Sequence, residues 1–587
     1  MSRGSPLNFW TEREAPEALV GGLVAAGYPL LLSKILALRG ISAETAPGFF
    51  SPSIANLARP SELPGVEAAA KVILDAVLRG DGIVIFGDYD CDGVCASSIL
   101  AIAIGAISRN GERPAVFLPE RLKEGYGMTS ASVSRMLSEN PGVKLVVTVD
   151  NGINSVDEVA ALKSQGLSVV VTDHHLPGET LPAADALVNP KVSAPAHLEG
   201  LCGAGVAFML ANAVVTKARE INLYSGPNVG GPLLILAGLA TVTDIMPLMG
   251  QNRIIVSEAL RRFHSLAPTG LRELFLRASR SSAPSLTSKD FGFLIGPRIN
   301  AAGRMASATD ALNLILATDR EKCREFAQIV DVRNVERKNI EQAMLDEALS
   351  KVVPGAPAQV IDLPNGHQGV AGIVAARILE RLGENPSDGG AKPVCVVVKG
   401  HGSARAPEGY NLREAFLYAA DALDRFGGHA AAGGFSVKEG EIDRFRELFC
   451  EGCAKQLVAM PAEQRGGMMT LDSWISPADI TLEFAEAIQR MEPFGEANPE
   501  PLFGLKGVVL GEVRQIGADG RHLSLAFRNH DIPKSVWWNK GDRVEEFRAA
   551  STIPYDIVFA LEISEYIARH VELRIVDITP SRHRDEK

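Results

Sequence analysis

The stretch Gly87-Asp88-Tyr89-Asp90-Cys91-Asp92-Gly93 directly follows the apolar run Gly82-Ile83-Val84-Ile85-Phe86. Three carboxylates therefore stand at alternate positions where a predicted buried strand ends. Because like charges this close repel one another, folding tolerates them most readily when cations neutralise them. The stretch predicts a strand that leads into a metal-binding acidic loop.

Two later segments repeat this design. The β-branched run 144–149 ends at Asp150, and the Val-rich run 168–172 ends at Asp173-His174-His175. Such runs are typical of strands buried on both faces of a parallel sheet. Roughly 20 or more residues separate them, which leaves room for a crossover helix. Because functional groups gather beyond the carboxyl ends of such strands, we expect these side chains to meet at one edge of the sheet.

A fourth acid, Asp244, stands inside the apolar helical run 239–247 and is a further candidate ligand. Each acid has a plainer interpretation, since an Asp after a strand is often only a turn former or a helix N-cap. A His-His pair is likewise more often structural than catalytic. Four coincident sites would each need such an explanation, and this favours a metal centre. The spacing excludes an EF-hand loop, whose ligands lie within one segment.

Composition narrows the class of protein. The chain has 587 residues, enough for about four domains, and 46% hydrophobic and 22% charged residues. The formal charge of 59 − 70 = −11 gives no overall basic signature, although a local basic groove remains compatible with it. Seven scattered cysteines argue against a disulfide framework. Without a clean apolar span or a signal core, we expect no membrane association and a cytoplasmic location.

The patterning changes several times along the chain. The β-rich last block, with short runs separated by turn residues, suits a small barrel, of which the OB type is one member. Acids, bases and apolar residues at helical spacing predict a long helix over 331–349. The expected parts are an N-terminal accessory segment 1–65, a first α/β domain 66–260, a helical connector 261–345, a second α/β domain 346–462 and the β-rich domain 463–587.

The second α/β domain and its connector carry residues suited to phosphate. Gly427 to Gly434 is a Gly-rich run with one His, and such loops let backbone amides approach a phosphate; a tight turn against a helix is the equal alternative. Gly366 to Gly372 opens an apolar helix, and helix N-termini bind anions. The segments 297–304 and 402–405 carry arginines, which clamp phosphates well but also pair with acids.

One further loop, Pro119 to Gly127, has bases and an aromatic residue flanked by Gly. Arg121 and Tyr126 there suit backbone contact and base stacking on a single strand, and an ordinary surface loop would have the same composition.

Taken in order, these segments resemble the motifs of the DHH phosphoesterase superfamily and, within it, of the single-stranded-DNA-specific exonucleases. Segments 87–93, 149–152, 173–175 and 243–247 are similar to the motifs of the DHH domain, and 300–304, 366–372, 402–405 and 428–429 to those of the companion DHHA1 domain and its connector. Met491 to Phe503 is similar to the segment before the OB domain of those exonucleases. The resemblance covers residues 65 to 580. The barrel departs most, because an Asn is expected near Ser564 and Trp537-Trp538 is not a general feature.

The resemblance implies an α/β fold. A parallel-sheet DHH domain is joined by a long helix to a second α/β domain, DHHA1, and an OB-type β-barrel follows. Two divalent cations are expected, and the mixed carboxylate–imidazole ligands suit Mn²⁺, with Mg²⁺ as the alternative. The implied metal ligands are Asp88, Asp90, Asp92, Asp150, His174 and Asp244. The implied catalytic residues are Asp90, Asp92, Asp150, His174, Asp244 and His175, the last near the scissile phosphate.

The implied substrate contacts come from the connector, the DHHA1 domain and the loop at 119–127. They are Arg121, Tyr126, Asn300, Arg304, His367, Ser403, Arg405 and His429. Asp173 is expected to orient the His-His pair rather than to bind metal.

The implied activity is 5′→3′ degradation of single-stranded DNA to mononucleotides in recombination and repair. The chain would act as a monomer, with a helicase and a single-strand-binding protein as partners. One alternative is a DHH phosphoesterase for short oligoribonucleotides or cyclic dinucleotides, against which the extra barrel and the loop at Tyr126 argue. The other is a non-catalytic single-strand-binding scaffold, which would be expected to lose metal ligands that are present here.

Overall fold

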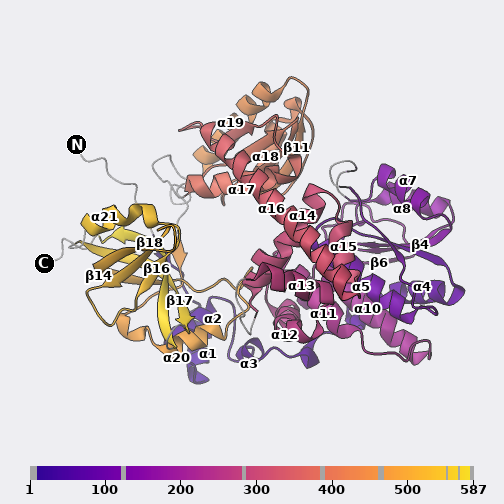
Figure 1. Cartoon of the computed structure of the whole chain (residues 1–587), viewed down its shortest axis with the longest axis horizontal. Coiled ribbons are helices and arrows are strands. Elements are labelled where there is room, and N and C mark those ends of the chain that lie inside the picture. The colour runs from indigo at the N-terminus through magenta and orange to yellow at the C-terminus, as the bar shows by residue number, and fades with distance from the viewer. Residues whose placement is uncertain are drawn as a thin grey trace. The chain divides into compact units, whose positions relative to one another are not determined.

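The computed structural model describes residues 10–120, 124, 127–279, 286–383, 391–460, 469–549, 553–565 and 569–581. The chain divides into two compact units. One is Pro52–Arg465, and the other joins Met1–Ser51 to Gly466–Lys587. Figure 1 follows the chain through both, from indigo to yellow.

The first part of the larger unit is a five-stranded parallel sheet, in the order β3-β2-β4-β5-β6. Its strands are β2 (Gly82–Phe86), β3 (Ala115–Phe117), β4 (Val143–Val149), β5 (Ser168–Thr172) and β6 (Ala186–Val188). The predicted strands before Asp88, Asp150 and Asp173 are thus confirmed. Side chains alternate between two hydrophobic clusters, one on each face, so the sheet is buried on both sides.

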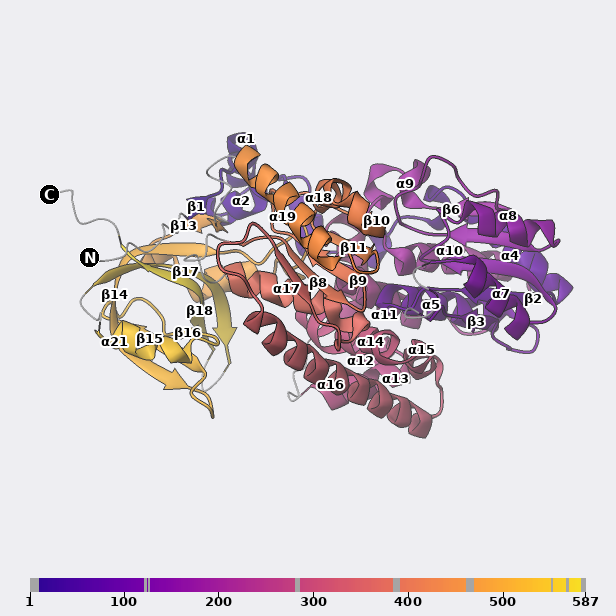
Figure 2. The same cartoon turned by 90° about the horizontal axis from the view of Figure 1, so that it is seen from above.

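Helices cover both faces of this sheet. The cluster with Ile83 and Val147 includes α4 (Val66–Arg79), α5 (Cys91–Ile107) and α10 (Gly203–Glu220), which lie together in Figure 2. The cluster on the opposite face includes α7 (Ser130–Glu139) and α8 (Val156–Ser164). A short α9 (Pro190–Ser193) follows β6. Because β2, β4 and β5 run parallel and adjacent, their carboxyl ends share one edge of the sheet.

A run of helices then leads to the second sheet. It comprises α11 (Gly230–Thr243), α12 (Gly250–Leu266), α13 (Thr269–Ala278), the π-helical turn Asp290–Ile295, α14 (Gly296–Met305), α15 (Thr309–Leu316) and the 31-residue α16 (Arg320–Ser350). The long helix expected over 331–349 lies within α16, which begins eleven residues earlier. An ion pair between Arg298 and Asp331 (2.9 Å) ties α14 to α16.

The second sheet has the order β10-β11-β9-β8-β7. Only β7 (Gln359–Asp362) and β8 (Val394–Val398) are parallel; β9 (His401–Arg405), β11 (Ala432–Val437) and β10 (Leu423–Gly428) follow as antiparallel strands. Helix α17 (Gln368–Gly383) packs on one face, and α18 (Leu412–Tyr418) and α19 (Ile442–Ala459) pack on the other.

The Gly-rich run 427–434 forms a tight turn, one of the two interpretations that its sequence allows. It is the end of a β-hairpin between β10 and β11. One of its glycines serves aromatic packing, because a Cβ on Gly433 would lie 2.6 Å from the ring of Phe416. In the neighbouring strand, a Cβ on Gly402 would lie 2.1 Å from Phe435.

The smaller unit contains the predicted barrel. Strands β14 (Phe503–Ile516), β15 (His522–Phe527), β16 (Ser535–Trp537), β18 (His570–Pro580) and β17 (Pro554–Ser564) pair in that order, and β17 closes on β14. The short β13 (Ser473–Trp474) and α20 (Leu482–Gln489) precede the barrel strands, and α21 (Val544–Ala549) lies between β16 and β17 in the sequence. The sequence patterns missed β16, which has only three residues.

The N-terminal residues expected as an accessory segment belong, up to Ser51, to this barrel unit. They form β1 (Thr11–Glu12), α1 (Glu17–Ala25), α2 (Leu30–Ala37) and α3 (Ala46–Phe50). Strand β1 pairs with β12 (Thr470–Leu471), and the Trp10 indole donates a hydrogen bond to Asp577 (3.1 Å). The guanidinium of Arg39 lies 3.2 Å from the Asp472 carboxylate, with both side chains buried.

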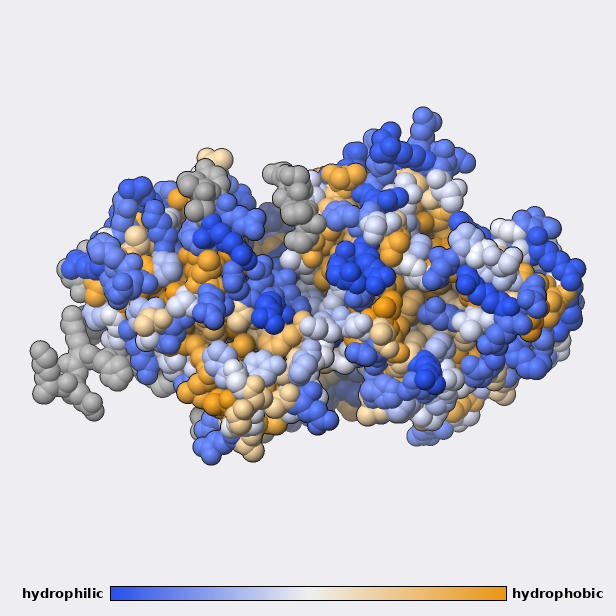
Figure 3. Space-filling view, turned by 90° about the horizontal axis from the view of Figure 1, so that it is seen from below, coloured by the Kyte–Doolittle hydropathy of each residue, from blue (hydrophilic) through white to orange (hydrophobic). Residues whose placement is uncertain are grey.

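Among the helices of the described residues, none combines the length and the hydropathy that a membrane crossing requires. The face drawn in Figure 3 alternates hydrophilic and hydrophobic residues.

Replacing Arg39 tests how the N-terminal segment is held. We expect Arg39→Ala to destabilise the barrel unit by about 3–5 kcal/mol, because Asp472 would keep a buried charge without its cation. All four tryptophans, Trp10, Trp474, Trp537 and Trp538, lie in this unit. Urea titration followed by tryptophan fluorescence therefore reports its unfolding alone. Arg514→Ala, which removes an exposed ion pair with Glu512, should cost no more than about 1 kcal/mol. An equally small effect of Arg39→Ala would contradict this account.

Candidate metal centre

The acid loop, Gly87 to Gly93, turns sharply from β2 into α5. Asp90 is the N-cap of α5, and its Oδ1 accepts a hydrogen bond from Gly93 N (3.0 Å). The turn is so tight that a Cβ on Gly93 would lie 2.6 Å from the Cβ of Asp88. Asp88 and Asp92 are buried in consequence, and Asp90 is partly exposed.

Asp92 is held by the first turn of α10. Its two carboxylate oxygens accept hydrogen bonds from Gly203 N and Ala204 N, both at 2.7 Å. Free amides and the positive end of the helix dipole favour a carboxylate at this place. Gly203 also lies against Asp150, since a Cβ there would be 2.7 Å from Asp150 Oδ1. Sequence reasoning missed this contribution, although the run Gly203-Ala204-Gly205 signals a close backbone approach.

The predicted ligands from three further elements meet the acid loop. Asp150 follows β4 in a left-handed conformation (φ 61°), and His174 follows β5. Asp244 directly follows α11 as its C-cap, rather than lying inside the helix as the sequence suggested. The ring atom His174 Nε2 lies 3.0 Å from Asp150 Oδ1, 3.6 Å from Asp92 Oδ2 and 3.7 Å from Asp244 Oδ2.

Two groups of donor atoms, each within 4.8 Å, share no residue: Asp88, Asp90 and Asp150 form one, and Asp92, His174 and Asp244 form the other. Together these are the six residues expected from the sequence to bind metal. A third group, overlapping both, adds His175. Asp150 Oδ1 is also buried without a hydrogen bond within the described residues. These residues fit two divalent cations, since carboxylate oxygens and a neutral imidazole are ligands of Mn²⁺ and Mg²⁺ sites.

Burial and crowding shift the pKa values across the site. Burial, followed by repulsion from neighbouring acids, raises the pKa of Asp90 and of Asp150, and it raises that of Asp244 to about 8. Burial lowers the pKa of His174 to about 4, so its imidazole is neutral at pH 7. Without cations, carboxylates of this site therefore bind protons more readily than usual, whereas metal binding requires them to be ionised.

Asp173 holds the two histidines. Its carboxylate accepts hydrogen bonds from the backbone N–H of Ile153 (2.9 Å), His174 (2.7 Å) and His175 (3.1 Å), and its Oδ1 lies 2.7 Å from His175 Nδ1. Burial alone would lower the pKa of His175, but the hydrogen bond and charge of Asp173, together with the charges of Asp244 and Asp88, outweigh burial and raise that pKa. The side chain of His175 is 39% exposed.

Four of the predicted substrate contacts gather at the start of α17. The guanidinium of Arg304 donates to the Gly369 carbonyl (3.1 Å), and His367 Nδ1 accepts from Gly369 N (3.2 Å). Ser403 and Arg405 on β9 flank the next turn, because a Cβ on Gly372 would lie 3.4 Å from Ser403 Oγ and 3.2 Å from Arg405 Nη2.

The other four predicted contacts do not join this group. His429 is exposed in the turn of the β10–β11 hairpin. The amide oxygen of Asn300 accepts a hydrogen bond from Cys91 N (2.8 Å), in the acid loop. Arg121 and Tyr126 lie outside the described residues.

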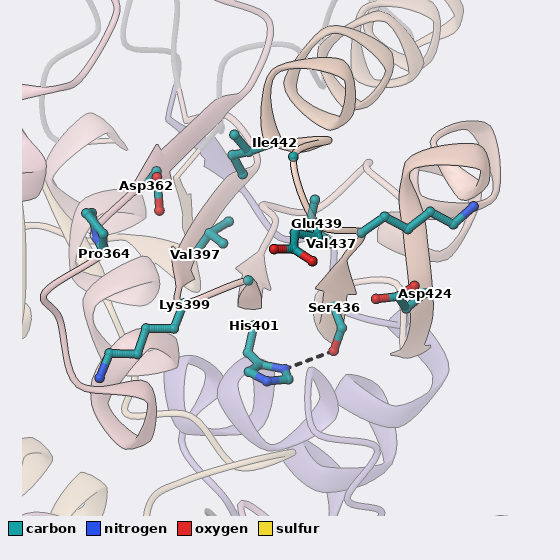
Figure 4. Close-up of a pocket in the computed structure, with 13 residues that line it drawn as sticks. Asp362, Pro364, Val397, Lys399, His401, Asp424, Ser436, Val437, Glu439 and Ile442 are labelled. Atoms are coloured by element: carbon teal, nitrogen blue, oxygen red, sulfur yellow. Dashed lines mark hydrogen bonds between the residues drawn. The ribbon is translucent and has the colours of Figure 1, made fainter.

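A separate cavity of about 450 Å³ opens in the second sheet's domain (Figure 4). Its lining mixes the acids Asp362, Asp424 and Glu439 with Lys399 and Lys438. None of the predicted site residues lines it, and we assign no substrate to it.

Comparison with known proteins places these features in a family. Residues 82–229 match the model of the DHH family, N-terminal domain, and residues 471–577 match that of the RecJ OB domain. The single-stranded-DNA-specific exonuclease RecJ of Haemophilus influenzae is 36% identical over 490 residues, which are 81% of this chain and 83% of that protein. The chain belongs to the RecJ family.

Other RecJ proteins agree with this placement. Escherichia coli RecJ is 35% identical over 587 residues, covering 94% of this chain and 96% of the relative. The crystal structure of Thermus thermophilus RecJ in complex with Mn²⁺ matches with a TM-score of 0.81 and 29% identity, over 97% of this chain and 79% of that one. A structure of exonuclease RecJ bound to manganese is 35% identical, with a TM-score of 0.58, over 67% and 95% of the two chains.

The raised pKa values predict how metal binding depends on pH. Asp244 without metal is protonated below about pH 8, so a cation that binds at pH 7 must displace its proton. We expect the affinity for Mn²⁺ to increase with pH up to about 8, with net proton release at pH 7 and less at pH 9. Isothermal titration calorimetry in two buffers with different ionisation enthalpies measures that release. Mn²⁺ binding at pH 7 without proton release would rule out this assignment.

Proposed function

We infer that the chain is a metal-dependent exonuclease that degrades single-stranded DNA, the activity for which its RecJ relatives are named. The observation that carries this conclusion is the pair of carboxylate-rich donor groups at the carboxyl edge of the DHH-type sheet. It occurs in a chain that aligns with RecJ over nearly its whole length.

We further propose that Asp88, Asp90 and Asp150 hold one divalent cation and that Asp92, His174 and Asp244 hold a second. Solved RecJ structures in complex with Mn²⁺ and with Mg²⁺ support these ions as the cofactors. Two divalent ions in such a site lower the pKa of an attacking water and neutralise charge that develops on the phosphate.

The protein's own groups do the remaining work. The amides of Gly203 and Ala204 fix Asp92, and burial keeps His174 neutral so that a ring lone pair is available. Asp173 orients His175, whose raised pKa suits it to donate a hydrogen bond or a proton to an oxygen of the scissile phosphate.

The turn that opens α17 is the proposed binding site for a phosphate of the DNA strand. A helix N-terminus attracts anions through its backbone amides and its dipole. The side chains around this one are Arg304, His367, Ser403 and Arg405. His429, in the neighbouring hairpin turn, would contact the strand from its edge. The OB-type barrel would guide the strand, since such barrels stack and track single-stranded nucleic acid.

Several finer points of the proposal are supported by the likeness to the RecJ family alone. They are 5′→3′ polarity, mononucleotide products, a monomeric state, a cytoplasmic location and the partnership with a helicase and a single-strand-binding protein. The two alternative functions are not favoured. A binding scaffold would not need all six metal-binding side chains. A phosphoesterase that acts on short substrates would have no need of the barrel.

Removal of one proposed ligand tests the centre. Asp90→Ala should lower the rate of DNA hydrolysis with Mn²⁺ by at least about a hundredfold. Substituting a residue that only orients a metal ligand already lowers metal affinity or activity about 10–100-fold, and Asp90 is itself a proposed ligand. The measurement is digestion of 5′- and 3′-labelled single strands, with Asp157→Ala, an exposed acid on α8, as the matched control.

Full activity in Asp90→Ala would reject the metal assignment, and release of the 3′ label first would reject the polarity. Hydrolysis of dinucleotides much faster than of long strands would instead favour the short-substrate alternative.

A further inference from the structure

Helix α14 touches the acid loop at two points. The amide oxygen of Asn300 accepts the hydrogen bond from Cys91 N (2.8 Å). One turn further along, Gly303 packs so closely on the loop that a Cβ there would lie 2.5 Å from the Tyr89 carbonyl oxygen. The two contacts bracket Asp90 in the sequence.

The Cys91 N–H needs this external acceptor. Cys91 is the first residue of α5, and the first N–H groups of a helix have no carbonyl partner within it. Asp90 already satisfies the N–H of Gly93. The Cys91 peptide lies between Asp90 and Asp92, one from each proposed cation site, so whatever fixes this peptide restrains both carboxylates.

The C-terminal turn of α14 also contacts the second domain. Arg304 donates to the Gly369 carbonyl, and a Cβ on Gly369 would lie 2.7 Å from the Arg304 carbonyl oxygen, so the helices meet without space for a side chain. The C-terminal half of α14 is therefore packed against both the acid loop and α17, and this packing fixes the place of the Asn300 amide.

We propose that Asn300 is a positioning residue of the metal centre, not the substrate contact that its sequence motif suggested. This proposal rests on the proposed function, in which the acid loop binds the cations. Through the Cys91 N–H, Asn300 sets the places of Asp90 and Asp92. Loss of its acceptor oxygen should weaken Mn²⁺ binding about 10–100-fold, the usual effect of removing a group that orients a ligand.

Two variants of similar shape separate this role from packing. Asn300→Leu keeps the size but removes the acceptor, and Asn300→Asp keeps the acceptor. Calorimetric titration of the full chain with Mn²⁺ alone should show the weakened binding in Asn300→Leu and wild-type or tighter binding in Asn300→Asp. Fluorescence anisotropy with a labelled single strand in EDTA should show DNA affinity within about twofold of wild type for both variants. Saturating Mn²⁺ should restore much of the Asn300→Leu activity.

Arg298→Ala is the matched control for general damage to α14, because Arg298 pairs with Asp331 on α16 and none of its hydrogen bonds or ion pairs reaches the acid loop. It should leave the affinity for Mn²⁺ unchanged. Thermal melting of every variant, with Asn300→Ala measured alongside, excludes misfolding as the cause of a lost signal.

Unchanged Mn²⁺ affinity in Asn300→Leu would overturn the proposal. Equal losses in the Leu and Asp variants would also overturn it, as would DNA binding that falls in EDTA while Mn²⁺ binding does not. If the wild-type chain itself bound no Mn²⁺, the proposed function would fail at its own first step, which is a distinguishable result.

Discussion

The crowding of buried carboxylates at one sheet edge is the constraint on which the rest of the structure depends. Asp88, Asp92 and Asp150 are almost fully buried, and neighbouring acids raise the pKa of Asp150 beyond the effect of burial. The fold compensates part of this cost with backbone amides, from α5 to Asp90 and from α10 to Asp92. Repulsion among the carboxylates destabilises the fold without metal. Cations relieve this repulsion when they bind, so the crowding itself contributes to the affinity of the site for metal.

This part of the structure could be predicted from sequence because it is local. Valine-rich runs that end in Asp or His identify strands buried on both faces, and a parallel sheet brings their carboxyl ends to one edge. The same pattern predicts Asp150 and His174 at that edge. The barrel was predictable for a similar reason, since its four longer strands alternate clearly and end at turn residues.

What the sequence does not report depends on long-range contacts. The glycines of 427–434 suggest a phosphate loop, and the pattern does not show that Phe416 also requires Gly433 to lack a side chain. Asn300 resembles a substrate contact, although its hydrogen-bond partner lies 209 residues earlier. The attachment of the first 51 residues to the barrel depends on Arg39 and Asp472, 433 residues apart. No local pattern reports such pairs.

The central claim is that two divalent cations bind in two groups of three side chains. Anomalous diffraction from crystals grown with Mn²⁺ measures this most directly. The account predicts two peaks, one within coordination distance of Asp88, Asp90 and Asp150, and the other of Asp92, His174 and Asp244. Manganese bound away from these side chains, or no manganese at this edge, would contradict it.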